Sequence, residues 1–135
     1  MNVLFVGDMV GPDASPWLAS RLPDLKREHA IDLTIVNAEN ILVNTSPEGV
    51  ITSGMSADGV EALFAAGVDV ITSGNHAWDG PDSPRLLEHP RVIRPMNVPS
   101  EWGGRGLLTL QVNDETVTIV NLCDKDAIPE ATLAA

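Results

Sequence analysis

Three short polar segments of this sequence carry side chains that could bind metal ions. Each follows an apolar run, and the segments are Gly7-Asp8, Asn37-Ala38-Glu39-Asn40 and Gly74-Asn75-His76. Asp8 and Glu39 supply anionic oxygens, which suit divalent ions such as Mn²⁺, Mg²⁺ or Fe²⁺. Asn40 and Asn75 could add neutral carbonyl oxygens, and His76 could be either a ligand or a proton donor.

Each segment taken alone has an ordinary structural explanation. An aspartate that follows a glycine, such as Asp8, is more often a turn or cap residue than a ligand. Asn37 and Asn40 could simply close a turn, and Asn75 could hold a left-handed backbone angle. The joint pattern is harder to explain in this way, because all three segments end otherwise apolar runs.

The apolar runs predict strands that alternate with helices. Residues 3–6, 33–36 and 68–72 are typical of buried strands. One helix is expected after a loop at residues 12–16, with Trp17 in the core and with Pro23 kinking or splitting the helix. A second helix is expected from an N-cap at Ser56 to Gly67. Such an order favours a parallel sheet, whose strands end along one edge, so the three polar segments should converge in one crevice.

The rest of the chain completes an α/β prediction. A long polar loop is expected at residues 40–54, a short helix at 83–88 and a strand at 92–93. Residues 107–112 and 115–121 flank Asn113-Asp114, which predicts a two-residue hairpin. Residues 124–135 show no pattern of regular structure and are expected to be frayed. The predicted fold is therefore one domain over residues 1–135, a parallel sheet flanked by helices with a carboxy-terminal β-hairpin.

Composition limits the classes of partner. The net charge is −11, from 8 basic and 19 acidic side chains, which argues against a broad nucleic-acid surface. A small phosphate-containing substrate remains compatible, since a bound metal ion supplies positive charge locally. Cys123 is the single cysteine, so no intrachain disulfide can form, and a cytoplasmic location is expected. No apolar run is long enough to span a membrane.

The polar segments also resemble the successive motifs of a known family. Gly7-Asp8-Met9-Val10-Gly11, Asn37-Ala38-Glu39-Asn40 and Gly74-Asn75-His76-Ala77-Trp78-Asp79 look like those of the YmdB-like metallophosphoesterases. That family belongs to the calcineurin-like phosphoesterase superfamily and includes 2′,3′-cyclic-nucleotide phosphodiesterases. The resemblance continues through residues 92–97 and 103–106 into the hairpin, and it implies the first half of a calcineurin-like sandwich.

The resemblance implies a role for each candidate residue. Asp8 would bind the first of two divalent ions (Fe, Mn or Mg), and Glu39 would bridge both. Asn40 and Asn75 would contribute to the metal pair, and His76 would act as the general acid that protonates the leaving oxygen. A hydroxide between the two ions would attack phosphorus in line. The implied substrate is a small phosphodiester or nucleotide, and a homo-oligomer is left open.

One part of the family pattern has no counterpart here. The family continues with further metal-binding histidines, in a segment of the Gly-Thr-His-Thr-His type, whereas His29 and His89 follow no predicted core strand and are expected to be solvated. We therefore expect an incomplete metallophosphoesterase-like domain that binds metal weakly and turns over slowly or not at all. The main alternative is a non-catalytic α/β binding or assembly module. A dinucleotide-binding domain is disfavoured, because no G-x-G-x-x-G turn follows the first strand.

Overall fold

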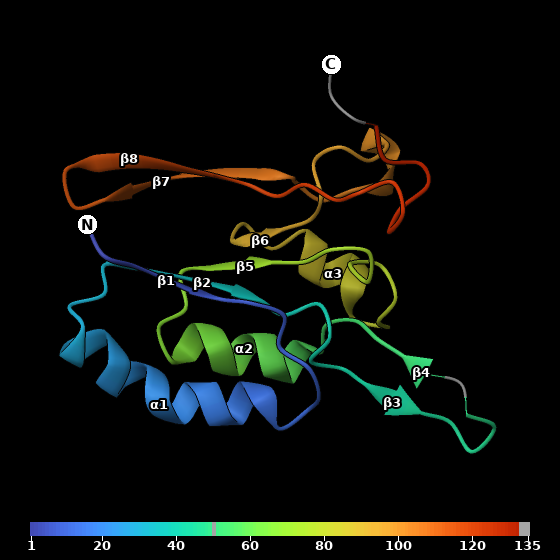
Figure 1. Cartoon of the computed structure of the whole chain (residues 1–135), viewed down its shortest axis with the longest axis horizontal. Helices are drawn as coiled ribbons and strands as arrows, with labels where there is room; N and C mark the ends of the chain where they lie inside the picture. The colour runs from blue at the N-terminus through green and yellow to red at the C-terminus, as the bar shows by residue number, and fades with distance from the viewer. Residues whose placement is uncertain (50, 133–135) are drawn as a thin grey trace.

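A parallel sheet lies at the centre of the computed structural model, which describes residues 1–49 and 51–132. Within these residues the sheet has four strands in the order β1-β2-β5-β6. Helices α1 and α2 cover one face, and the β7-β8 hairpin covers the other (Figure 1). The elements are β1 (Val3–Val6), α1 (Ala14–Glu28), β2 (Leu33–Asn37), β3 (Asn44–Thr45), β4 (Ile51–Thr52), α2 (Ala57–Ala65), β5 (Val70–Thr72), α3 (Ser83–Leu87), β6 (Val92–Ile93), the 3₁₀ helix η1 (Ser100–Trp102), β7 (Leu107–Val112) and β8 (Glu115–Val120). The predicted α/β fold class is confirmed.

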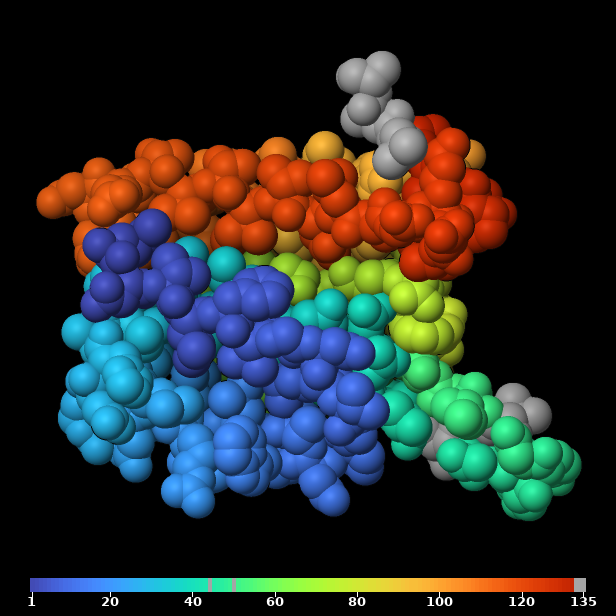
Figure 2. All heavy atoms as spheres, viewed as in Figure 1, coloured from blue at the N-terminus to red at the C-terminus, as the bar shows by residue number. Residues whose placement is uncertain are grey.

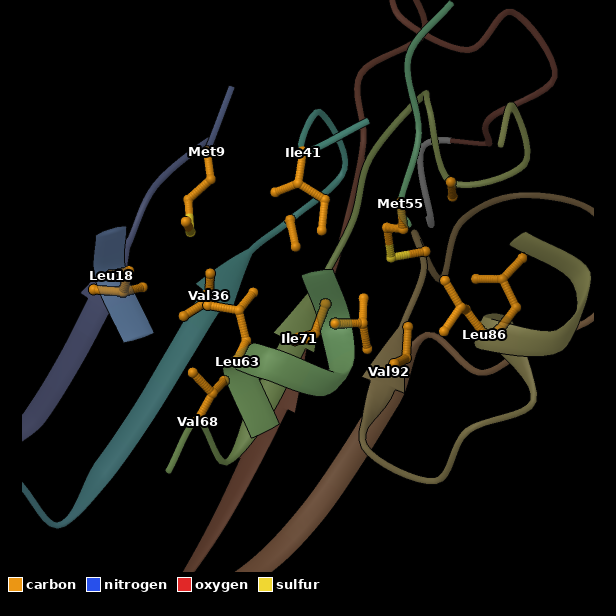
Figure 3. Close-up of a cluster of buried hydrophobic side chains, with 14 of the residues drawn as sticks. Met9, Leu18, Val36, Ile41, Met55, Leu63, Val68, Ile71, Leu86 and Val92 are labelled. Carbon is orange, nitrogen blue, oxygen red and sulfur yellow. The ribbon is translucent and has the colours of Figure 1, made fainter. Parts of the chain in front are cut away.

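The larger apolar core lies between the sheet and its helices. Leu18 of α1 and Leu63 of α2 pack with Val36 and Ile71 from the central strands (Figure 3). Leu63 and Ile71 are fully buried, so truncating either would leave a cavity. The second helix begins as predicted, because Ser56 Oγ accepts a hydrogen bond from the Gly59 amide at 3.3 Å. This core fixes the central strands, whose ends carry the polar segments.

A second, smaller core joins the hairpin to the opposite face of the sheet. Buried side chains of β2, β5 and β6 meet half-buried side chains of the hairpin: Leu33, Ile35, Val70 and Ile93 against Leu108, Leu110, Val117 and Ile119. The hairpin turns at Asn113, whose φ of 54° is the left-handed angle that a tight two-residue turn needs. The Asn113 amide also donates to Asp32 at 3.0 Å. The predicted hairpin is therefore confirmed.

Three details of the first helix differ from expectation. It begins at Ala14, within the expected loop, and it runs unbroken through Pro23. Its apolar face, with Leu18 and Leu22 buried, packs on the sheet, and this packing offsets the hydrogen bond that Pro23 cannot make. The side chain of Trp17 is 63% exposed. Trp17 is therefore outside the core, because it lies about 100° around the helix from Leu18.

Other regions also correct the sequence predictions. Val3 and Phe5 of β1 are exposed, since β1 is an edge strand of the sheet. The expected polar loop contains an antiparallel pairing of β3 with β4, and this segment projects from the body (Figure 2). Residues 124–132 lack helix and strand as expected, but they are packed rather than frayed, since Ile128 is buried among other apolar side chains. Residues 133–135, part of the same expectation, lie outside the described residues. Among the residues that the structure describes, none of the helices has the length and hydrophobicity of a membrane span.

The prediction that His89 is solvated is also wrong. Its half-buried ring stacks on Phe64 with a centroid distance of 4.6 Å, and the Arg91 guanidinium lies 4.1 Å from the centre of the Phe64 ring. Burial is the main cause that lowers the pKa of His89 below its usual value of 6.5, and the charges of Arg91 and Arg105 lower it further. His29, in contrast, is exposed as expected.

This lowered pKa predicts a pH dependence of stability. As pH falls below 6.5, His89 takes up a proton more readily in the unfolded chain than in the folded chain. Protonation of His89 therefore favours the unfolded chain, and the free energy of unfolding decreases toward acid pH. We expect His89→Phe to lose less unfolding free energy than the wild type between about pH 7 and about pH 5, as measured by urea unfolding. The matched control is His29→Phe. The prediction would be contradicted if His89→Phe and the wild type lost the same unfolding free energy on acidification.

Candidate metal centre

The three polar segments meet beyond the ends of β1, β2 and β5. The Met9 amide donates to the Asn37 carbonyl at 3.1 Å, and the Ala38 amide donates to the Thr72 carbonyl at 3.1 Å. Val10 forms a parallel bridge with Asn40. These bonds continue the pairing of the strands for a few residues past the sheet. The sheet edge therefore brings the three segments side by side.

Asp8 and Asn40 form the first contact between predicted site residues. The Asn40 side-chain amide donates to both Asp8 carboxylate oxygens, each at 3.0 Å. Asp8 is exposed and Asn40 is half-buried. Because its nitrogen is engaged with Asp8, the side-chain oxygen of Asn40 is the atom that could bind an ion. This pair therefore offers oxygen ligands that are accessible to solvent.

Glu39 lies deeper, with a relative exposure of 8%. One carboxylate oxygen accepts from the Asn37 side-chain amide at 3.3 Å, and the other accepts from the His76 backbone amide at 3.0 Å. Gly74 makes room for the carboxylate, since a Cβ at this position would lie 2.6 Å from each of its two oxygens. The second segment is thus joined to the third through Glu39.

The surroundings of Glu39 fit a cation. Its hydrogen-bond donors are neutral amides, and none of the salt bridges within residues 1–49 and 51–132 involves it. A buried carboxylate without a positive partner is costly, and a divalent ion would offset this cost. The oxygens available from Glu39, Asp8 and Asn40 are those that hard divalent ions prefer. These residues therefore suit the metal ions that the sequence resemblance implies.

His76 is held by a residue that the sequence analysis did not select. Its Nδ1 lies 2.6 Å from a carboxylate oxygen of Asp79. A proton on Nδ1 would be donated to Asp79, which leaves Nε2 to act on another molecule. The spacing of three residues between His76 and Asp79 in one turn was the available sequence signal. Asp79 therefore belongs to the candidate site as the residue that positions the imidazole.

Two further asparagines complete the description of the site. Asn75 is exposed, and no hydrogen bond among the described residues joins its side chain to Asp8, Glu39, Asn40 or His76. Asn121, which follows β8, donates to the Ser73 carbonyl and at 3.4 Å to the Ile93 carbonyl. No sequence signal links Asn121 to a position so distant in the chain. Within the described part, no three His, Cys, Asp or Glu side chains are grouped to hold a metal ion.

Comparison with known proteins assigns the chain to a family. Residues 4–133 match the model of the YmdB-like protein family. The chain belongs to that family. The YmdB-like chain is 29% identical over 130 residues to a 2′,3′-cyclic-nucleotide 2′-phosphodiesterase of Bacillus subtilis strain 168. This alignment covers 96% of the chain and 46% of the Bacillus protein.

Solved structures share the fold of this YmdB-like chain. A hypothetical protein from Thermus thermophilus superposes with a TM-score of 0.76 and 34% identity, over 90% of the chain and 44% of that protein. A phosphatase from Mycoplasma pneumoniae superposes with a TM-score of 0.74 and 31% identity, over 89% of the chain and 42% of the phosphatase. The YmdB-like chain thus spans less than half the length of each of these relatives.

Proposed function

We propose that this chain supplies part of the active site of a metal-dependent phosphodiesterase. The observation that carries the proposal is the buried Glu39 carboxylate, which rests over Gly74 and has only neutral hydrogen-bond donors. Asn40 follows Glu39 on the same segment, and Asp8 lies on the neighbouring segment, bonded to Asn40. The name of the Bacillus subtilis relative, a phosphodiesterase, supports the same reaction class.

Each candidate residue has a distinct task in this proposal. Asp8, Glu39, Asn40 and Asn75 would hold two divalent ions, with Mn²⁺, Fe²⁺ and Mg²⁺ as the candidates. When bound, such ions supply positive charge to the phosphoryl oxygens and make water a stronger nucleophile. The His76 imidazole donates a proton from Nε2 to the leaving oxygen.

Asp79 makes that proton transfer possible. Its carboxylate accepts the Nδ1 proton of His76, so the ring is held in one orientation with Nε2 directed away from Asp79. The substrate in this proposal is a small phosphodiester, such as a cyclic nucleotide. Carboxylates and amides supply only part of a shell for two ions, so we expect weak metal binding and slow turnover by the chain alone.

The proposal is tested by mapping Mn²⁺ on the whole chain with nuclear magnetic resonance. Mn²⁺ broadens the amide signals of nearby residues, and we expect Asp8, Glu39 and His76 to broaden first. Mg²⁺ added in excess should restore these signals by competition. The hydrolysis of bis(p-nitrophenyl) phosphate, measured in parallel, should require Mn²⁺ and stop on addition of EDTA.

Two outcomes would overturn the proposal. Broadening confined to other acidic positions, such as Glu28 or Asp114, would show that Mn²⁺ follows the overall charge and does not occupy the crevice. A folded chain with no Mn²⁺ effect at Asp8 and Glu39 would favour the alternative function, a non-catalytic α/β binding or assembly module. Tight binding of two Mn²⁺ ions would contradict the claim that this chain supplies only part of their ligands.

A further inference from the structure

A pocket of about 370 Å³ lies directly beside the candidate metal centre. Asn75 and Asp79 form the side of the pocket that it shares with the centre. Trp78, Trp102 and residues 127–130 form the other walls. A ligand bound in this pocket would therefore reach residues of the candidate site at Asn75 and Asp79.

Two tryptophans give the pocket flat apolar walls. The rings of Trp78 and Trp102 lie 4.9 Å apart between centroids and are inclined by 82° to one another, so they form a corner. Both side chains are half-buried, which leaves ring surface open to a ligand. A planar ring that stacks on one indole would meet the other at its edge, an arrangement that aromatic groups prefer.

The corner is held in place by its own contacts. The indole nitrogen of Trp78 donates to the Trp102 backbone carbonyl at 3.0 Å. Ile128 and Val98, which are 4% and 8% exposed, belong to the apolar cluster against which both tryptophans pack. The pocket therefore exists before any ligand enters, and binding does not require the tryptophans to be ordered first.

Charge determines which part of a ligand the pocket accepts. Asp79 and Glu130 are its ionisable groups, and neither Lys nor Arg is among the described residues that line it. A phosphate group would be repelled here, whereas a neutral planar ring with amino hydrogens would be accepted. The phosphate of the same molecule would lie on the Asn75 side, next to His76.

We propose that this pocket is a nucleobase subsite, with Trp102 and Trp78 as specificity-determining residues. The subsite rests on the proposed function for its role in catalysis, since it would orient a nucleoside phosphodiester with the phosphorus toward the metal centre. It makes nucleoside phosphodiesters, and not simple alkyl or aryl diesters, the preferred substrate class. Stacking on an aromatic side chain recognises bases with little regard to their identity.

Adenosine, which has a base and no phosphate, tests the subsite without the metal centre. In a titration of the ¹⁵N-labelled whole chain, we expect saturable shifts of the indole signals of Trp78 and Trp102. The exposed Trp17 indole provides an internal control and should not shift, and ribose alone should shift none of the three. Trp102→Leu should weaken adenosine binding by about tenfold, read from the Trp78 signal.

Matched variants make the result decisive. Trp17→Leu should leave the affinity for adenosine unchanged. Trp102→Leu keeps the backbone carbonyl that Trp78 uses, and Trp102→Phe keeps an aromatic ring and should lose less affinity. The absence of saturable shifts, or unchanged affinity in both Trp102 variants, would overturn the subsite. Mn²⁺ broadening at Glu39 without adenosine binding would reject the subsite alone, whereas adenosine binding without Mn²⁺ broadening would reject the proposed metal chemistry alone.

Discussion

Glu39→Gln is expected to weaken Mn²⁺ binding by about 10- to 100-fold or more. The substitution keeps the size of the side chain and removes its negative charge, which is the buried charge that the site offers to an ion. Changes to outer partners of metal ligands alone commonly cost 10- to 100-fold in affinity, so the loss of a ligand charge should cost at least as much. Isothermal titration of both proteins with Mn²⁺ measures the difference.

The control for this experiment is Glu28→Gln. Glu28 is an exposed carboxylate at the end of α1, just before β2 begins. It therefore lies near the amino-terminal ends of the strands, whereas Glu39 lies beyond their carboxyl ends. This variant makes the same change in net charge, so it separates a local effect from a general electrostatic one. Equal Mn²⁺ affinity in Glu39→Gln and Glu28→Gln would exclude Glu39 as a ligand.

Gly106→Ala should be the most destabilising of the substitutions considered for this chain. A Cβ at position 106 would lie 2.3 Å from the Cα and 2.7 Å from the backbone nitrogen of Met96. Backbone atoms cannot move aside as the end of a flexible side chain can, so β7 would have to separate from residues 94–96. We expect a loss of more than about 3 kcal/mol in unfolding free energy, measured by urea unfolding.

Gly7→Ala is the matched control for that result. No atom lies within 4 Å of a Cβ at position 7, so the same change of one methyl group should alter the unfolding free energy by less than about 1 kcal/mol. If both variants unfold at the same urea concentration, the close approach of Gly106 to Met96 does not exist in solution.

Much of the fold could be predicted from sequence, because local patterns determine it. The buried strand β2, the Ser56 cap and the Asn113 turn each follow from a few neighbouring residues. The errors arose where distant parts of the chain decide the outcome. Phe5 is exposed because of the order of strands in the sheet, and Pro23 is tolerated because α1 is packed.

The candidate site shows the same division. The convergence of Asp8, Glu39 and His76 followed from the rule that parallel strands end along one edge, and the hydrogen bonds of the crevice agree with it. The residues that support them were not selected from sequence: only the three-residue spacing from His76 pointed to Asp79, and the strand pattern does not encode the contacts of Asn121. Whether these residues bind metal stays a prediction.

The bond from Asn121 to the Ser73 carbonyl has a consequence for how the molecule moves. It ties the end of the hairpin to the residue just before Gly74, so the crevice and the second layer cannot loosen independently. Thermal fluctuations that lift the hairpin would release the backbone that carries Asn75 and His76. The geometry of the candidate site is therefore coupled to the mechanical integrity of the hairpin layer, which supplies none of the candidate residues.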